Sequence, residues 1–195
     1  CKRSIDICKE LSESGIEDSI KERTGLIIDP YFSGTKLIWL YRNDEKIRKA
    51  IDSGKALFGT VETWLLYKLT GGKSYFTDYT NASRTLFFNI IDMSRERSLM
   101  ESFNLKNLVL PEAKPSSCDF AESDFAGAFK HKVKISSVIG DSHAAAFGET
   151  CFESGTAKAT MGTGCSILLN TGEKRISSRN GMVTTICFSL KDKVY

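Results

Sequence analysis

The sequence predicts an α/β fold, and three observations support this class. Apolar residues recur at helical spacing through residues 4–103, whereas extended apolar runs dominate from residue 133 onward. The run at 133–139 passes directly into a glycine–aspartate pair and a stretch of small residues, which is typical of a strand handing over to a helix. Hydrophobic residues make up 41% of the 195 residues, an ordinary share for a folded protein.

Helices dominate the first part of the chain. Gly25 ends the first helical pattern, as glycine at a helix C-terminus does, and Ser33 is the expected N-cap of the next helix. A pair of glycines, Gly71 and Gly72, stops the last of these patterns. The predicted helices span residues 4–23 with a break at Gly15, 35–41, 44–52 and 60–69.

Strands become frequent toward the C-terminus. Ser94 is the expected cap of a helix that runs to about Phe103, and residues 104–132 are expected to be irregular because they contain Pro111 and Pro115. A helix is expected over 143–149. Extended segments are expected at 74–77, 85–91, 133–139, 155–161, 165–170 and 182–189.

The change from helical to β-rich sequence predicts a domain boundary near residue 146. We therefore expect one domain over residues 1–145 and the beginning of a second over 146–195. The chain opens on Cys-Lys-Arg-Ser without an initiator methionine, and we expect it to be an internal segment of a longer protein.

The net charge and the cysteine content limit the classes of function that the sequence favours. A net charge of +3 with no basic cluster favours neither a nucleic-acid partner nor a membrane surface. The six cysteines form no Cys-x-x-Cys pair, so we expect reduced, mostly buried thiols in the cytoplasm. With two histidines in the chain, a Cys/His zinc site is not expected.

Asp141 is the first candidate for chemistry. It follows the strand-like run 133–139, and ligands of open α/β sheets bind outside the carboxyl ends of strands. A carboxylate there can accept the proton of a substrate hydroxyl that attacks phosphorus. The alternative is that an aspartate before a helix acts only as an N-cap.

A tight turn, Gly162-Thr163-Gly164, is the second candidate. Two glycines let the backbone approach a phosphate and turn its N–H groups toward it, although a plain hairpin turn is the more frequent use of such a tripeptide. It is not a dinucleotide fingerprint, because Ile167 stands where the third glycine would be.

Tyr31 and Arg84 lie in two further polar segments. Tyr31, within 29–36, offers a ring and a hydroxyl to a small polar ligand, or else it is a buried aromatic at a helix entrance. Arg84, within the ordered loop expected over 77–85, could contact a phosphate, although an ion pair within the protein is the more common use of such a residue.

Several of these segments together resemble the FGGY family of carbohydrate kinases, and within it the members that phosphorylate glycerol. The likeness runs in order over nearly the whole chain, so a chance match is a poor explanation. The segments that carry it are 24–36, 57–65, 80–85, Gly140-Asp141 with Ala144-Ala145, 162–165 and 170–173.

The resemblance implies a ribonuclease H-like (actin-like ATPase) fold of two domains that close over a cleft. Residues 1–145 would be the later part of the first, polyol-binding domain, and 146–195 the opening strands of the second, ATP-binding domain. The segment alone would then be inactive, because parts of both pockets lie outside it. The implied substrates and cofactors are a polyol or sugar, glycerol first, together with ATP and Mg²⁺.

The resemblance also assigns roles to individual residues. Asp141 falls on the catalytic base, which would also contact substrate and metal. Glycerol-phosphorylating members carry glutamine where Ser142 stands and phenylalanine where Ser166 stands, and either change can alter discrimination between substrates. The implied site residues are Asp141, Tyr31, Ser142 and Ser166 for the substrate, and Gly162, Thr163 and Gly164 for the ATP phosphates.

The two serines leave other functions open. A kinase for another polyol or sugar is one, and an inactive, actin-like nucleotide-binding regulator is a second. A purely structural domain is a third, weaker one. His143 could contact a substrate oxygen, but an exposed histidine at a helix start is the plainer expectation. Members of the family often form dimers or tetramers, so a homo-oligomer is expected for the full-length protein.

Overall fold

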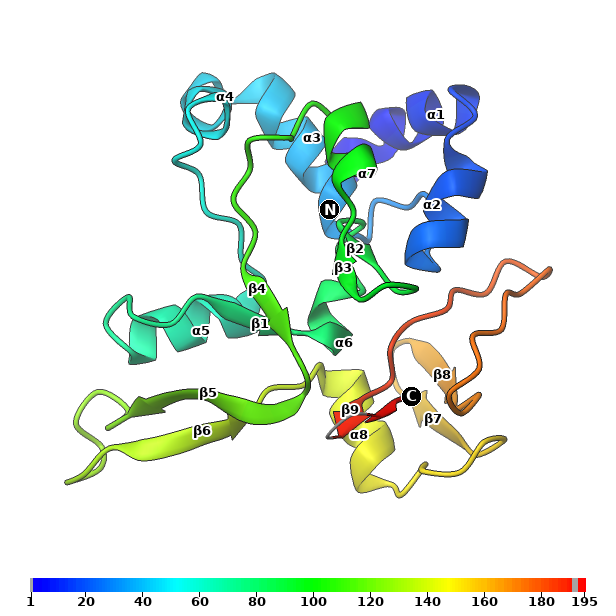
Figure 1. Cartoon of the computed structure of the whole chain (residues 1–195). Helices are drawn as coiled ribbons and strands as arrows, with labels where there is room; N and C mark the ends of the chain where they lie inside the picture. The colour runs from blue at the N-terminus through cyan, green and yellow to red at the C-terminus, as the bar shows by residue number, and fades with distance from the viewer. Residues whose placement is uncertain (1, 191–192) are drawn as a thin grey trace. The chain divides into compact units, whose positions relative to one another are not determined.

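A computed structural model describes residues 2–190 and 193–195 of the chain (Figure 1). The described chain divides into two compact units that each combine separated stretches of sequence. The helical unit contains the chain up to Thr60 together with Ala82–Glu112 and Ser178–Thr185, and the mixed unit contains Val61–Asn81, Ala113–Ser177 and the chain from Ile186 on.

Short helices around one apolar core make up the helical unit. The most buried members of this core include Ile20, Leu26, Leu86 and Leu105, none of which exposes any surface. Removing such side chains from water is the main stabilising contribution to a unit of this size. The elements are η1 (Lys2–Ser4), α1 (Ile5–Glu13), α2 (Glu17–Thr24), α3 (Ser33–Asn43), α4 (Glu45–Asp52), β2 (Phe88–Asn89), β3 (Ser94–Arg95) and α7 (Arg97–Ser102).

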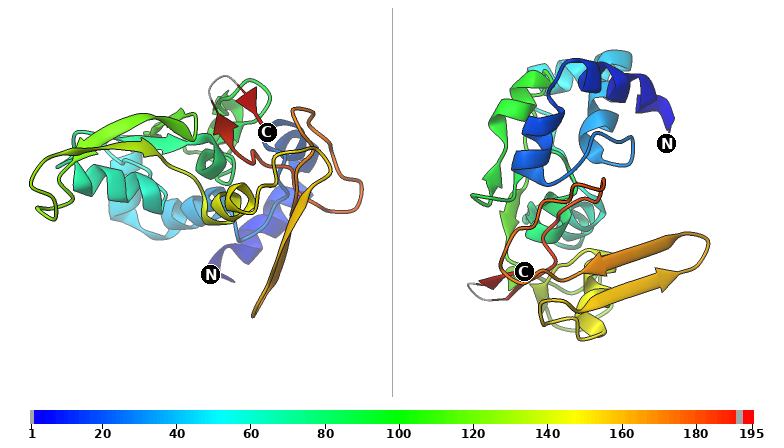
Figure 2. Two further views of the ribbon diagram at one scale, coloured as in Figure 1. Left: turned by 90° about the horizontal axis from the view of Figure 1, so that it is seen from below. Right: turned by 90° about the vertical axis from the view of Figure 1, so that its right-hand side faces the viewer.

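The mixed unit combines helices with small sheets of paired strands. Strand order in its largest sheet is β10-β9-β5-β6, with β5 and β6 antiparallel, while β1 pairs with β4. β7 and β8 form a separate antiparallel hairpin, seen edge-on and face-on in Figure 2. The elements are α5 (Val61–Leu69), β1 (Phe76–Asp78), α6 (Tyr79–Ala82), β4 (Glu112–Lys114), β5 (Ser117–Ser123), β6 (Val133–Ser137), α8 (Asp141–Gly148), β7 (Ala157–Met161), β8 (Cys165–Leu169), β9 (Ser189–Leu190) and β10 (Lys193–Val194).

Most of the predicted helices are confirmed. Gly25 ends α2 in the left-handed conformation with φ of 73°, and Asp44 caps α4 by accepting from the backbone N–H groups of Lys46 and Ile47. The break near Gly15 separates α1 from α2. These ends follow from local chemistry, because a glycine tolerates positive φ and an aspartate accepts from the first free N–H groups.

Both predicted serine caps are wrong. Phe32 is the N-cap of α3, and the hydroxyl of Thr35 closes the preceding turn by donating to carbonyls there. Ser94 pairs with Asn89 in a two-stranded ribbon, and α7 begins after Glu96. Ser94 instead donates to the carboxylate of Asp92, from its backbone N–H at 3.2 Å and from its hydroxyl at 2.7 Å.

Two predictions for the later chain are also wrong. Residues 104–132 are not irregular throughout, because β4 and β5 lie there and β5 pairs with β6. The strand predicted over 182–189 is reduced to β9 at Ser189–Leu190, and the N–H of Thr184 donates to the carbonyl of Gly25. Likewise, the predicted 85–91 strand is only β2. In the described residues, no helix is long and apolar enough to cross a lipid bilayer.

Candidate functional site

Asp141 is exposed and begins α8. Strand β6 ends at Ser137, and the chain then runs through Val138–Gly140 before the helix starts. Gly140, not Asp141, occupies the N-cap position, and the Oδ1 atom of Asp141 accepts from the N–H of Ser142 at 2.6 Å. A carboxylate in the first turn is favoured by the helix dipole, and its exposure leaves it accessible to a ligand.

His143 is buried at 6% exposure, so the expectation of an exposed histidine is wrong. Its ring lies over Gly140: a Cβ added at that glycine would stand 2.8 Å from Nδ1 of His143 and 3.4 Å from the Thr80 hydroxyl. The histidine therefore packs beneath the start of α8. This position gives it a structural role in the chain before Asp141.

The Gly162-Thr163-Gly164 turn is the exposed end of the β7–β8 hairpin (Figure 2). The N–H of Gly162 donates to the carbonyl of Gly164 at 2.9 Å. Neither glycine has a left-handed φ, and an added Cβ would meet open space at both. In the described chain, this turn is therefore open to solvent on the side where a Cβ would stand.

Ser142 and Ser166 occupy different elements of the mixed unit. Ser142 is half-buried in the first turn of α8, and Ser166 is exposed on β8, where it pairs with Thr160 of β7. α8 packs against β7, so the helix that carries Asp141 and Ser142 contacts the hairpin that carries the glycine turn. Six of the seven predicted site residues thus belong to this unit.

Tyr31 is the seventh, and it belongs to the helical unit. Its side chain is 69% exposed, so the alternative of a buried aromatic is wrong; Phe32 is the buried ring beside it. The N–H of Tyr31 donates to Asp29 Oδ1 at 2.7 Å, and the ammonium of Lys36 donates to the Tyr31 carbonyl at 2.8 Å. The backbone of Tyr31 is therefore fixed while its ring remains accessible.

The guanidinium of Arg84 lies over the rings of both Tyr31 and Phe32. Its guanidinium carbon lies 5.7 Å from the centroid of that ring and 4.9 Å from that of Phe32. Burial lowers the pKa of Arg84, and the neighbouring Tyr31, through its charge and a hydrogen bond, opposes that shift. Within the described ranges Arg84 has no carboxylate partner, so the expected ion pair is replaced by stacking on two rings.

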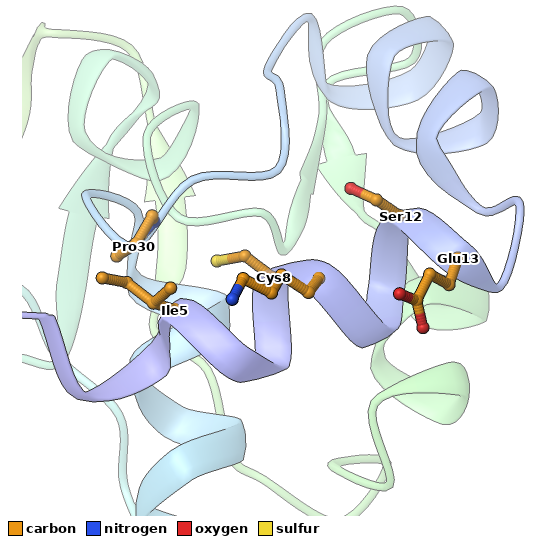
Figure 3. A pocket seen from close by; sticks show the side chains of 6 residues that line it. Ile5, Cys8, Ser12, Glu13 and Pro30 are labelled. Atoms are coloured by element: carbon orange, nitrogen blue, oxygen red, sulfur yellow. The ribbon is translucent and has the colours of Figure 1, made fainter.

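A shallow pocket of about 370 Å³ opens elsewhere in the helical unit (Figure 3). Its lining comes from α1 and from the turn at Pro30, and it includes the thiol of Cys8, whose pKa is raised mainly by burial. None of the predicted site residues lines it. The lining residues are Ile5, Cys8, Lys9, Ser12, Glu13 and Pro30.

A metal ion that is held by protein side chains alone needs a set of several donor groups. Among residues 2–190 and 193–195, no group of three or more His, Cys, Asp or Glu side chains could form a protein cage. Mg²⁺ is commonly bound by one or two carboxylates together with phosphate oxygens and waters. The exposed carboxylate of Asp141 fits that kind of partial site.

Sequence reasoning missed one part of this region. The sequence predicts an ordered loop over 77–85, but nothing near Ser116 in the sequence indicates that its hydroxyl donates to Asp78, 38 positions away. This contact becomes visible only in the folded chain, where the end of β1, which carries Asp78, lies next to Ser116 before β5.

Three comparisons with known proteins agree. The sequence profile described as "FGGY family of carbohydrate kinases, N-terminal domain" matches residues 1–148. Glycerol kinase of Carboxydothermus hydrogenoformans is 47% identical over 194 residues, which are 100% of this chain and 39% of that relative. Glycerol kinase of Fusobacterium nucleatum is 47% identical over 195 residues, again 100% and 39%. The chain therefore spans about 39% of the length of these curated relatives.

Solved structures extend the likeness to the fold. The Plasmodium falciparum glycerol kinase crystallised with ADP superimposes with a TM-score of 0.92 at 37% identity, covering 98% of this chain and 38% of that one. Xylulose kinase from Rhodospirillum rubrum shares the fold alone, with a TM-score of 0.77 at 18% identity over 89% of this chain and 35% of its own.

The prediction of a mixed α/β, ribonuclease H-like (actin-like ATPase) fold is confirmed by these neighbours. The expectation of a family resemblance is confirmed by the profile over 1–148 and by relatives that match the whole chain. On these grounds the chain belongs to the FGGY family of carbohydrate kinases.

Proposed function

We propose that the full-length protein transfers the γ-phosphoryl group of ATP to a primary hydroxyl of glycerol, producing glycerol 3-phosphate. The observation that carries the proposal is the exposed carboxylate of Asp141 at the start of α8, in a chain 47% identical to proteins named glycerol kinase. Phosphoryl transfer needs a group that orients the attacking hydroxyl, and an accessible carboxylate can do so.

Asp141 is the proposed general base. It would accept a hydrogen bond from the substrate hydroxyl, align the oxygen with the γ-phosphorus and take the proton as the O–P bond forms. The exposed Gly162–Gly164 turn would offer backbone N–H groups to the phosphates, where charge develops. A Mg²⁺ ion bound by Asp141 and phosphate oxygens would neutralise charge on the transferred group.

The substrate and nucleotide would be held by different parts of the chain. We assign residues 1–145 to the polyol-binding domain, with Tyr31 presenting its exposed ring and hydroxyl to the substrate, and residues 146–195 to the start of the ATP-binding domain. The segment alone should be inactive, because it spans about 39% of its relatives. We further place the full-length enzyme in the cytoplasm, where ATP is available, as a homodimer or homotetramer.

A second substrate is favoured by two residues. Ser142 and Ser166 are small and partly or fully exposed, and the hydroxyl of each can donate a hydrogen bond to a further hydroxyl group of a substrate. A longer polyol or a sugar would use such donors, whereas glycerol would not need them.

A coupled ADP-release assay on the full-length protein with a panel of polyols and sugars tests the proposal. Glycerol should give the highest kcat/KM, and Asp141→Asn should lower kcat by about three orders of magnitude or more while leaving folding and ATP binding intact. Turnover close to wild type in that variant would remove Asp141 from its role. ATP binding without turnover on any substrate would instead indicate a nucleotide-binding regulator.

A further inference from the structure

A buried carboxylate, Asp78, lies at the centre of a hydrogen-bond cluster beneath the start of α8. It exposes no surface, and it accepts from both the backbone N–H and the hydroxyl of Thr80, at 3.1 and 2.8 Å. Asn81 donates its backbone N–H at 3.1 Å and its side-chain amide at 2.7 Å, and the hydroxyl of Ser116 donates at 2.8 Å. These N–H and O–H groups satisfy the buried carboxyl oxygens, as burial of such a polar group requires.

The Thr80 hydroxyl extends this cluster to the backbone before Asp141. Its oxygen lies 2.8 Å from the backbone nitrogen of Gly140. A carboxylate ion only accepts, so the hydroxyl hydrogen of Thr80 is committed to Asp78 and its oxygen faces Gly140 as an acceptor. The buried carboxylate therefore fixes the orientation of the hydroxyl, and the hydroxyl fixes the N–H of Gly140.

Gly140 is held at its other end as well. Its carbonyl accepts from the N–H of Ala144 at 2.7 Å, which is the first hydrogen bond of α8. No side chain fits at this position, because a Cβ would stand 2.8 Å from His143 Nδ1 and 3.4 Å from the Thr80 hydroxyl. Any shift of Gly140 would therefore lengthen one of its two hydrogen bonds or change its contact with His143.

Ser116 ties the same cluster to the end of β6. Its hydroxyl donates to Asp78, while its carbonyl accepts from the N–H of Val138 at 3.0 Å. Both Ser116 and Thr80 are buried, at 3% and 0% exposure. The chain between β6 and α8 is consequently attached to Asp78 at two points, at Val138 through Ser116 and at Gly140 through Thr80.

We propose that Thr80, oriented by Asp78, is a positioning residue for phosphoryl transfer: it fixes the backbone of Gly140 and thereby aims the carboxylate of Asp141 at the substrate hydroxyl. This inference rests on the proposed role of Asp141 as the base. Geometry at a catalytic base must hold within a fraction of an ångström, and the side chain of Asp141 can keep its place only if the backbone that carries it is held as well.

Thr80→Val in the full-length protein tests the proposal, because valine keeps the shape and removes both hydrogen bonds. We expect kcat to fall by about tenfold or more, while KM for ATP and for the polyol changes less than about threefold. Thr80→Ser restores the hydroxyl and should recover kcat to within about threefold of wild type. A Val variant with wild-type kcat, or a Ser variant as slow as the Val variant, would overturn the proposal.

Thr70 supplies a matched control in the same unit. Its hydroxyl donates to the Leu66 carbonyl at 2.7 Å and accepts from the N–H of Ser74 at 3.0 Å, so Thr70→Val removes the same kind of hydrogen-bond pair away from α8. We expect a loss of thermal stability in both Val variants and a loss of kcat only at Thr80. An equal loss of kcat at Thr70 would mean that general destabilisation explains the effect.

A double-mutant cycle separates this inference from the proposed function. If Thr80 acts through Asp141, then Thr80→Val should change the residual kcat of an Asp141→Asn enzyme by less than about twofold. Full additivity of the two losses contradicts the positioning role. Wild-type turnover in Asp141→Asn alone contradicts the proposed function instead.

If Thr80→Val does not fold, the isosteric Asp78→Asn takes its place, and wild-type kcat in that variant overturns the proposal.

Discussion

Arg23 of α2 donates from Nη1 to Oε1 of Glu96, the N-cap of α7, at 3.1 Å, although the two residues are 73 positions apart in sequence. The same carboxylate accepts from Ser98 at 2.6 Å and from the amide of Asn89 at 2.9 Å. Glu96 is 4% exposed, whereas the side chain of Arg23 is 43% exposed. The pair therefore joins α2 to the start of α7. Its carboxylate is buried, whereas its guanidinium stays in contact with water.

Glu96→Ala should lower the free energy of unfolding of the full-length protein by about 1–3 kcal/mol, because Asn89 and Ser98 lose their acceptor while Arg23 can still be hydrated. Urea unfolding followed by tryptophan fluorescence measures the change. The control is Glu45→Ala in the exposed pair with Lys49 at 2.7 Å, which should cost less than about 1 kcal/mol. Equal losses at both positions would contradict the argument.

Gly25→Ala should destabilise the helical unit severely, because a Cβ would run into the carbonyl oxygen of Thr184 and because φ there is +73°. Gly15→Ala provides the comparison: it also has a positive φ, of +76°, but a Cβ would meet nothing within 4 Å. We expect about 1 kcal/mol for Gly15, the cost of the backbone conformation alone, and several times more for Gly25. Similar melting temperatures for the two variants would show that the close approach of Thr184 is unimportant.

Arg84→Met should raise KM for the polyol by about threefold to tenfold with a smaller change in KM for ATP, because the guanidinium stacked on Tyr31 and Phe32 keeps the Tyr31 ring in place. Steady-state kinetics on the full-length protein measures this. Arg3, whose guanidinium lies 5.2 Å from the ring centroid of Trp39, offers the matched control: Arg3→Met should leave both KM values unchanged. An unchanged KM for the polyol in Arg84→Met would show that the stacked guanidinium is not needed for substrate binding at Tyr31.

Cys187 should resist alkylation at neutral pH while Cys165 reacts readily. Burial raises the pKa of the Cys187 thiol to about 11 from its ordinary 9.0, and Cys151 adds a smaller repulsive effect. Cys165 is exposed, and thiolates rather than thiols react with iodoacetamide. Mass spectrometry of the full-length protein after brief treatment at pH 7.5 should therefore find the label on the peptide with Cys165 and little on that with Cys187.

The same shift predicts how stability changes with pH. The folded protein keeps the Cys187 proton to a higher pH than the unfolded chain, so the stability contributed is fully present below about pH 9 and is lost as the pH rises toward 11. Cys187→Ala should make the decline of unfolding free energy between those values less steep than in wild type. An identical decline in the variant would show that this thiol is not responsible.

Local chemistry was sufficient to predict most of the helices. Gly25, Asp44 and the apolar spacing of residues 4–69 act within a few positions of themselves, so their effect on α1 to α5 can be predicted from neighbours alone. Asp141 was recognisable for the same reason, because the strand before it and the small residues after it mark a strand–helix junction.

Tertiary structure decided whatever depends on partners far along the chain. It set the N–H of Thr184 against the carbonyl of Gly25, 159 positions away in sequence, and left only Ser189–Leu190 of the predicted 182–189 strand as a strand. It also joined Asp78, Thr80 and Ser116 under Gly140. The sequence by itself determined which residues carry charge and which elements present them. Only the folded chain decided how Gly140, and with it the start of α8, is held. The reason is that polar groups buried away from water must find hydrogen-bond partners, and here those partners lie far apart in sequence.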